Sequence, residues 1–347
     1  MKLFTFDAAE FADTYRTRGW VHVRDGVSPE FLGHLQESCR RHAADEVLHG
    51  TGIRGAKDQY LYEPPADVAL VAELRDVVCA MCGLDAESFT LAERHIKSYS
   101  SDADPAPVAH KDRLASQVSI GVSIEVPEGS HLVLYPDVYR EVNHFLTAEL
   151  SESLAPDERP DVILDDAPAV EIFDRPGDVV LFPGSAVWHL RRNSADTVNL
   201  YLKCNDFDCD PLGEDPSTEQ RWRATAQRLA ASSGAGALVG AAPVLSRRLE
   251  WVGAHVGRDG VTRSLAKLWD RPPTLVSDAE MAVLERLGAR RSPDARQANG
   301  EAKKRVPVDD VVIGLARREL IDLVGSAENA DLGAQRTDEH VGARTAV

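Results

Sequence analysis

The sequence predicts an α+β protein whose core is a double-stranded β-helix, or jelly roll, with N-terminal helices before it and a helical C-terminal extension after it. Between about residues 88 and 205, short runs rich in Val, Ile, Leu and Tyr are separated by turns of Gly, Pro and Asp, which is typical of strands. Helical patterns do not alternate regularly with these runs, so antiparallel sheets are favoured over a parallel one. The flanking segments instead have apolar residues at three- and four-residue spacing, which indicates helices.

The N-terminal segment predicts three helices and one short strand. Apolar spacing predicts a helix over residues 7–17, and "GWVHVRDG" at 19–26 predicts a strand. A second helix begins at "SPE", where Ser28 suits the N-cap and Pro29 the first helical turn. The third helix is expected over 66–83. These elements precede the β-rich core.

The C-terminal part is expected to be helical. "SDAEMAVLERLGARR" begins with Ser277 and Glu280, which have the spacing of a capping box. The other predicted helices are residues 216–232, 243–256, 261–269 and 308–325. We therefore expect three parts: a jelly-roll core with N-terminal helices (1–206), a helical extension packed on that core (207–326), and a disordered tail (327–347).

Composition excludes several classes of function. The 347 residues include 39 Lys and Arg against 56 Asp and Glu, a formal net charge of −17, whereas binding to nucleic acid requires clustered basic residues. Apolar runs fall well short of the roughly 18 residues that span a bilayer, and acids interrupt the N-terminus where a secretory leader would be apolar. Five cysteines fit reduced thiols, so we expect a cytoplasmic protein without a nucleic-acid or membrane partner.

Cys79 and Cys82 have Cys-x-x-Cys spacing but no second pair. They lie in the apolar helical stretch "VALVAELRDVVCAMCGL", so we interpret them as helix residues and not as a zinc or redox site.

The chemistry of the chain is expected at "VAHKDRLAS", where His110 and Asp112 are two positions apart. Composition alone predicts about two such His-x-acid pairs, so the surroundings must decide. In "GDVVLFPGSAVWH", a turn, a strand and a tight connection lead to His189. In an extended backbone, His110 and Asp112 point to the same face. Two imidazoles and one carboxylate on one face of Fe(II) leave three positions for a bidentate co-substrate and dioxygen.

A simpler interpretation of each residue stays open. His189 alone could be an imidazole at the surface, and Asp112 could pair with Lys111 or Arg113. The metal-site hypothesis depends on all three ligands meeting.

Three stretches together resemble the Fe(II)/2-oxoglutarate-dependent oxygenases, and specifically the phytanoyl-CoA dioxygenase-like branch. They are "GWVHVRDGVSPE", "HIKSYSSDADPAPVAHKD" and "PGDVVLFPGSAVWH", and the resemblance covers about residues 10–206. It implies that His110, Asp112 and His189 bind Fe(II), with 2-oxoglutarate and O₂ as co-substrates. The intact Asp112 favours hydroxylation, since halogenases of this fold replace that carboxylate with a small residue.

The sequence departs from the family at the anchor for 2-oxoglutarate. The family usually holds the far carboxylate with an arginine about ten residues past the distal histidine, but Val198 and Asn199 stand there. We expect Lys97, on the strand leading toward the His-x-Asp pair, to take this role. The other candidates for binding the co-substrate are Lys203, Arg192 and Thr197.

The resemblance implies a hydroxylase that couples conversion of 2-oxoglutarate to succinate and CO₂ with oxidation of a C–H bond. The charge of −17 disfavours acyl-CoA and favours a cationic substrate. The Ala-, Arg- and Asp-rich composition fits secondary metabolism, so we expect a small polar metabolite such as an aminocyclitol or aminoglycoside. A validamycin-type pseudo-sugar hydroxylase in antibiotic biosynthesis is the example we favour.

Two alternatives come from other classes. One is a cupin-type metalloenzyme, since "HLRRN" matches the end of the second cupin motif, although "HKD" lacks the second histidine of the first motif. The other is a jelly-roll binding protein without catalytic activity. The helical extension has two expected roles, shaping the pocket at the open end of the sheets or forming a homodimer.

Overall fold

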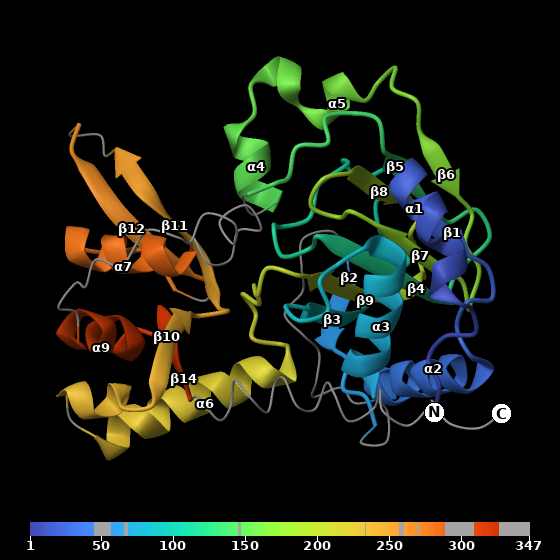
Figure 1. Ribbon diagram of the computed structural model, residues 1–347. Coiled ribbons are helices and arrows are strands. Elements are labelled where there is room, and N and C mark those ends of the chain that lie inside the picture. Colours follow the sequence, from blue (N-terminus) through green and yellow to red (C-terminus); the bar gives the residue numbers. More distant parts are fainter. Residues whose placement is uncertain are drawn as a thin grey trace. The chain divides into compact units, whose positions relative to one another are not determined.

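The computed structural model describes residues 1–44, 57–65, 69–144, 147–232, 234–256, 260–269, 271–288 and 309–325. The chain divides into two compact units, Met1–Asp206 and Phe207–Val347 (Figure 1). The predicted tail at 327–347 lies outside the described residues.

Among the residues that the structure describes, the first unit contains nine strands, with most of its helical residues near its N-terminus. Its helical elements are η1 (Ala8–Phe11), α1 (Ala12–Arg18), α2 (Pro29–Ala44), α3 (Leu70–Cys82), α4 (Thr147–Ser153), η3 (Pro156–Glu158) and α5 (Pro160–Ile163). Its strands are β1 (Val21–Val23), β2 (Lys57–Leu61), β3 (Thr90–Tyr99), β4 (Val118–Glu125), β5 (His131–Tyr135), β6 (Val170–Ile172), β7 (Val179–Phe182), β8 (Trp188–Arg192) and β9 (Val198–Asn205). The predicted N-terminal helices and the β-rich segment from 88 to 205 are confirmed.

These strands form two antiparallel sheets, as the sequence predicts. One sheet has six strands in the order β1-β7-β4-β9-β3-β2, and the other has three in the order β6-β5-β8. An isolated antiparallel bridge joins His110 to His189 on β8. The chain segment at His110 therefore extends the smaller sheet beyond β8.

The six-stranded sheet is apolar on one face and polar on the other. On β9, Leu200 and Leu202 belong to a hydrophobic cluster that includes Phe31 of α2 and Leu74 of α3, so these helices cover that face (Figure 1). Because side chains alternate along a strand, the intervening residues of β9, such as Lys203, lie on the opposite face. This inner face carries the polar groups of the candidate site.

The two helices on the outer face follow familiar sequence rules. In α3, the buried residues Leu70, Leu74, Val78 and Met81 recur every three or four positions, which forms one apolar stripe. Gly83 ends this helix with a φ of 75°, a left-handed conformation that glycine adopts without strain.

Ser28 caps α2, because its hydroxyl accepts a hydrogen bond from the Phe31 N–H at 3.1 Å. The predicted N-cap is confirmed.

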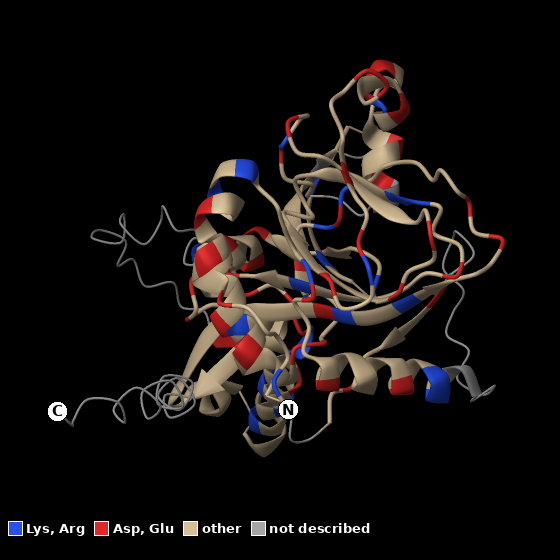
Figure 2. Cartoon of the chain, turned by 90° about the vertical axis from the view of Figure 1, so that its right-hand side faces the viewer, with Lys and Arg blue, Asp and Glu red and all other residues tan. Residues whose placement is uncertain are grey.

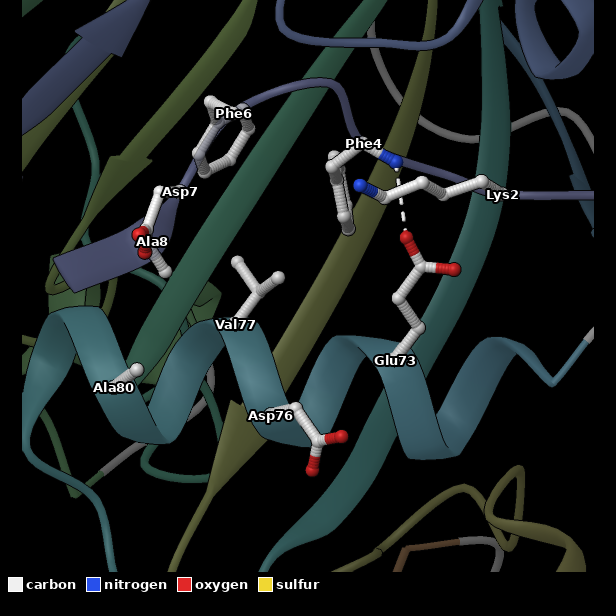
Figure 3. Close-up of a pocket in the computed structure, with 9 residues that line it drawn as sticks. All are labelled: Lys2, Phe4, Phe6, Asp7, Ala8, Glu73, Asp76, Val77 and Ala80. Carbon is white, nitrogen blue, oxygen red and sulfur yellow. Dashed lines mark hydrogen bonds between the residues drawn. The ribbon is translucent and has the colours of Figure 1, made fainter. Parts of the chain in front are cut away.

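The first residues of the chain lie against α3. The Glu73 carboxylate accepts hydrogen bonds from the backbone N–H groups of Leu3 and Phe4. Beside this contact is an open hollow lined in part by Phe6 and Val77 (Figure 3). None of the predicted metal ligands lines this hollow.

A buried ion pair connects the two sheets of the first unit. Arg191 on β8 donates to both carboxylate oxygens of Asp174, at 3.0 and 2.6 Å, just beyond β6. The same carboxylate accepts from the Ser123 hydroxyl on β4 at 2.5 Å, and Arg191 also donates to Ser130. Burial opposes ionisation of Asp174, but Arg191 and Ser123 outweigh it and lower its pKa.

The second unit mixes helices and strands, so the prediction of a helical extension is correct for only part of it. Its helical elements are α6 (Pro216–Ala231), η4 (Gly234–Leu238), α7 (Asp278–Gly288) and α9 (Asp309–Arg317). Its strands are β10 (Ala241–Leu245), β11 (Leu249–Val256), β12 (Thr262–Leu268), β13 (Thr274–Leu275) and β14 (Ile321–Gly325), in sheets β10-β14 and β11-β12-β13. The predicted helices at 243–256 and 261–269 are strands.

The error has a physical cause. Short apolar runs fit helix and strand spacing equally well, and pairing decides between them. On β12, Ala266 and Leu268 are buried while the residue between them is half-buried, which is strand alternation.

The last predicted helix also stops early, because Glu319 adopts a φ of 61° and β14 follows. The capping box of α7 is confirmed, since Ser277 N–H donates to the Glu280 carboxylate at 2.7 Å.

We predict that Asp174→Asn destabilises the protein by about 3–5 kcal/mol at pH 7, because Arg191 is then a buried charge without a counterion. A carboxylate whose folded pKa is lowered stabilises above its unfolded value of about 3.9, and this contribution is lost as the pH falls below that value. The gap between parent and variant should therefore shrink by about 1.4 kcal/mol per pH unit below pH 4.

Urea denaturation at pH 7, 5, 4 and 3 measures this gap. The exposed Asp166 provides the control Asp166→Asn, which should match the parent throughout. A gap that stayed constant across the pH series would contradict the prediction.

Candidate metal centre

The backbone brings His110 and His189 together although they are 79 positions apart. The N–H of each residue donates to the carbonyl of the other at 2.9 Å, as in a hydrogen-bonded antiparallel pair. Their ring centroids are 4.4 Å apart. This single bridge places both imidazoles on the same side of the smaller sheet.

Asp112 is held by the connection between β7 and β8. Its N–H donates to the Gly184 carbonyl at 2.9 Å, and the Asn143 side chain donates to its carbonyl at 3.0 Å. A Cβ at position 184 would lie 1.9 Å from the Ser119 hydroxyl and 2.6 Å from Asp112 Oδ2. Glycine is therefore required here, because any side chain would displace the carboxylate.

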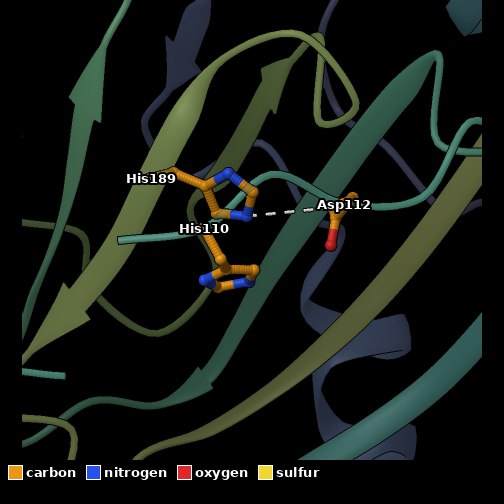
Figure 4. Close-up of side chains that lie close together, drawn as sticks. All are labelled: His110, Asp112 and His189. Carbon is orange, nitrogen blue, oxygen red and sulfur yellow. Dashed lines mark ion pairs between the residues drawn. The ribbon is translucent and has the colours of Figure 1, made fainter. Parts of the chain in front are cut away.

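The three side chains converge as a compact group (Figure 4). One ligand atom from each of His110, Asp112 and His189 lies within 4.8 Å of the others, and His189 Nε2 is 3.8 Å from Asp112 Oδ2. Among the described residues, this is the single group of three or more His, Cys, Asp or Glu side chains with such an arrangement. Lys111, between the ligands, points away and lies over the Trp188 ring.

These residues fit a divalent metal of the first transition row. Two imidazoles and a carboxylate form the donor set that leaves positions open on non-haem Fe(II). The Nδ1 of His189 is 2.9 Å from the Val187 carbonyl, which holds the proton on Nδ1 and presents Nε2 to the centre. Asp112 Oδ2 accepts from the Ser119 hydroxyl at 2.8 Å, so the carboxylate is also oriented.

A chain of alternating charges continues from Asp112 across the inner face of the larger sheet. Lys203 Nζ lies 2.9 Å from Asp112 Oδ1 and 3.2 Å from Glu93 Oε2. The other oxygen of Glu93 lies 3.2 Å from Lys97 Nζ. Each charge in this chain faces an opposite one, which is the condition for burying ionised groups.

Burial and the charge chain together shift the pKa values of Asp112, Glu93 and His189. Burial raises the pKa of Asp112, but Lys203 and the two histidines outweigh it, so the pKa lies below its usual range. Burial likewise opposes ionisation of Glu93, and Lys203 and Lys97 lower its pKa well below the usual value. For His189, burial lowers the pKa and exceeds the opposing effect of Asp112. A neutral imidazole and an ionised carboxylate are the forms that bind metal.

The predicted co-substrate residues lie in different surroundings. Lys97 is on the inner face of β3, with its Nζ 5.0 Å from the Tyr201 ring centre. Lys203 is engaged by Asp112 and Glu93. Thr197 is buried beside Ser130, their hydroxyls 2.9 Å apart.

Arg192 follows the inward-facing Arg191 on β8 and so points to the opposite side. Its side chain is 45% exposed and lies 3.9 Å from Glu171. The structure does not bring Arg192 to the metal ligands.

Sequence reasoning missed Glu93, Ser119 and Gly184. Glu93 and Ser119 are the direct neighbours of Lys203 on the strands to either side, β3 and β4. No local signal marks them, because their importance comes from the register of three strands that are distant in sequence.

Residues of both charges are mixed along the described part of the chain. Figure 2 shows Asp and Glu interspersed with Lys and Arg on both helices and strands. No helix in the described ranges is both long and apolar enough to span a membrane.

No protein-family model matches this chain, and no curated protein matches it. Similar solved structures include SnoN, a non-heme alpha ketoglutarate dependent epimerase from nogalamycin biosynthesis, in complex with Fe³⁺, alpha ketoglutarate and nogalamycin RO (18% identity, 58% of this chain, 84% of that chain, TM-score 0.43). Another is HygX from Streptomyces hygroscopicus with nickel, 2-oxoglutarate and hygromycin B (14% identity, 58% of this chain, 87% of that chain, TM-score 0.40). A third is a Pseudomonas putida prolyl-4-hydroxylase (18% identity, 57% of this chain, 97% of that chain, TM-score 0.40).

Two of these solved structures thus contain a metal ion together with alpha ketoglutarate (2-oxoglutarate) and a small molecule, which is nogalamycin RO in SnoN and hygromycin B in HygX. The ligands named above belong to those proteins. At these identities and TM-scores, the chemistry of this chain is assigned from its own site.

Proposed function

We propose that this protein is a non-haem Fe(II)/2-oxoglutarate-dependent oxygenase with His110, Asp112 and His189 as its metal ligands. The observation that carries the proposal is the convergence of their ligand atoms within 4.8 Å, with His189 presenting Nε2 and Asp112 oriented by Ser119. When bound, Fe(II) and 2-oxoglutarate would activate dioxygen for oxidation of a C–H bond. The chain's own residues hold and orient these groups.

We interpret the first unit as a jelly roll. Four adjacent strands of the larger sheet run in the order β7-β4-β9-β3, and the smaller sheet runs β6-β5-β8 and then the His110 segment. Two antiparallel sheets of four segments each are the arrangement of a double-stranded β-helix. This supports residues 1–206 as the oxygenase core and 207–326 as a separate appended region.

We assign the anchor for the far carboxylate of 2-oxoglutarate to Lys97. Lys97 is directly paired with Asn199 across β3 and β9, and Asn199 stands where the arginine was expected. Directly opposed side chains have Cβ atoms about 5 Å apart, so the lysine can supply a cation to nearly the same place. Its side chain is 14% exposed, and Lys203 still balances Glu93 when Lys97 turns toward a ligand.

For the substrate, we propose a small polar and cationic secondary metabolite of the aminocyclitol or aminoglycoside kind, which is hydroxylated. In the ion pairs near the centre, three carboxylates face three basic groups, so these pairs carry no excess negative charge that would favour a cation. Support for a cationic substrate comes instead from the net charge of −17, which attracts cations to the protein as a whole.

We predict that anaerobic titration with Fe(II) and 2-oxoglutarate produces the weak visible charge-transfer band of this cofactor pair. Asp112→Ala should weaken Fe(II) binding by about 100-fold or more and abolish the band, because it removes the anionic ligand. Asp166→Ala, at an exposed position, serves as the control. A parent protein without the band, or an Asp112→Ala variant equal to the parent, would overturn the proposal and favour a cupin-type or non-catalytic protein.

We predict that Lys97→Met weakens 2-oxoglutarate binding about 10- to 100-fold, as expected from loss of a charge-assisted hydrogen bond. Fe(II) binding without 2-oxoglutarate should change much less, since the ion pair of Lys97 is with Glu93 and not with a proposed metal ligand. Titration of the same visible band measures both. If Arg192→Ala weakened 2-oxoglutarate binding and Lys97→Met did not, the anchor would be assigned to Arg192 instead.

We predict that aminocyclitols and aminoglycosides increase the rate at which the enzyme forms succinate from 2-oxoglutarate, and that N-acetylated forms of the same compounds do not. Acetylation removes the positive charge and keeps the hydroxyl-rich skeleton, so it isolates the electrostatic contribution. Equal stimulation by both forms would refute the cationic substrate while leaving the oxygenase proposal intact.

A further inference from the structure

The two carboxylate oxygens of Asp112 have different surroundings. Oδ1 lies 2.9 Å from the ammonium of Lys203, whereas Oδ2 accepts from Ser119 and lies 3.8 Å from His189 Nε2. The Lys203 side chain is 8% exposed. One oxygen therefore faces a fixed cation, and the other faces the histidine ligand.

Lys203 is confined to this position from both sides. In the strand register, Lys203 pairs directly with Glu93 on β3 and with Ser119 on β4. Moving its ammonium away would leave Asp112 without its nearest cation and weaken the pairing of Glu93, and both carboxylates are buried. Separating buried charges is costly, so the ammonium remains against Oδ1.

A divalent ion that coordinated Oδ1 would be placed close to this ammonium. The repulsion between them is strong in a site with little water. Coordination through Oδ2 avoids the ammonium and leaves its hydrogen bond to Oδ1 intact. The position of the ammonium therefore favours binding of the ion through Oδ2 alone over binding through both oxygens.

We propose that Lys203 is a positioning residue that restricts Asp112 to coordination through Oδ2 alone. With two histidines and one oxygen as protein ligands, a six-coordinate ion keeps three positions for 2-oxoglutarate and dioxygen. Binding through both oxygens would leave only two, and 2-oxoglutarate would fill them. This inference rests on the proposed function and assigns to Lys203 a role other than anchoring the co-substrate.

The test counts exchangeable water positions on bound Mn(II), used alone as a paramagnetic probe in the full chain. In Lys203→Met, Asp112 is free to bind through both oxygens, so the water-proton relaxivity per bound Mn(II) should fall by about one third, from three positions to two. Glu93 keeps Lys97 as its partner in this variant. Should Lys203→Met fail to fold by circular dichroism, Lys203→Met/Glu93→Gln, which removes both opposite charges, is expected to show the same loss.

Lys267→Met is the matched control, because it removes another largely buried Lys–Glu pair, with Glu250 at 2.6 Å, in the second unit. It should keep the parent relaxivity. A folded Lys203 variant that binds Mn(II) with the parent relaxivity would overturn this inference alone. A parent protein whose Mn(II) binding did not depend on Asp112 would instead overturn the proposed function and this inference together.

Discussion

The candidate centre depends on the register in which β3, β9 and β4 pair. That register places Glu93, Lys203 and Ser119 side by side across three strands, and two of these residues contact the Asp112 carboxylate. A shift of one residue would turn each of these side chains to the opposite face. Their apolar neighbours along the strands, such as Leu202, would then face the candidate metal ligands, and the charged groups would enter the core against α2 and α3. The hydrophobic core and the polar site therefore specify the same register.

Burial of charge is the second constraint on the site. Asp112, Glu93, Lys203 and Lys97 alternate in sign along one chain of contacts, so each supplies the counterion of the next. A separate pair forms between Asp174 and Arg191, which is on the same strand as His189, and Ser123 of the larger sheet donates to the Asp174 carboxylate. The candidate metal ligands thus lie in a preorganised surrounding, in which the pKa values of Asp112 and His189 are both lowered.

Much of the fold and part of the candidate site could be predicted from the sequence. Strand-rich segments, the N-cap at Ser28 and the capping box at Ser277 have local signals, so they were predicted correctly. The candidate ligands could be singled out because a His-x-Asp pair and a strand leading to His189 are visible in sequence. Glu93 and Ser119 could not, since their places beside Lys203 and Asp112 come from the pairing of strands that are distant in sequence. The strands of the second unit were missed because their short apolar runs also fit helical spacing, and only the pairing itself, such as that of β11 with β12, decides between the two.

The most direct test of a shared metal site is a crystal structure from crystals grown anaerobically with Mn(II) and 2-oxoglutarate. Diffraction data are collected at wavelengths on either side of the manganese absorption edge. We expect one strong anomalous peak in contact with His110, Asp112 and His189. A peak at other residues, or full occupancy of 2-oxoglutarate elsewhere with no peak between these three side chains, would contradict it.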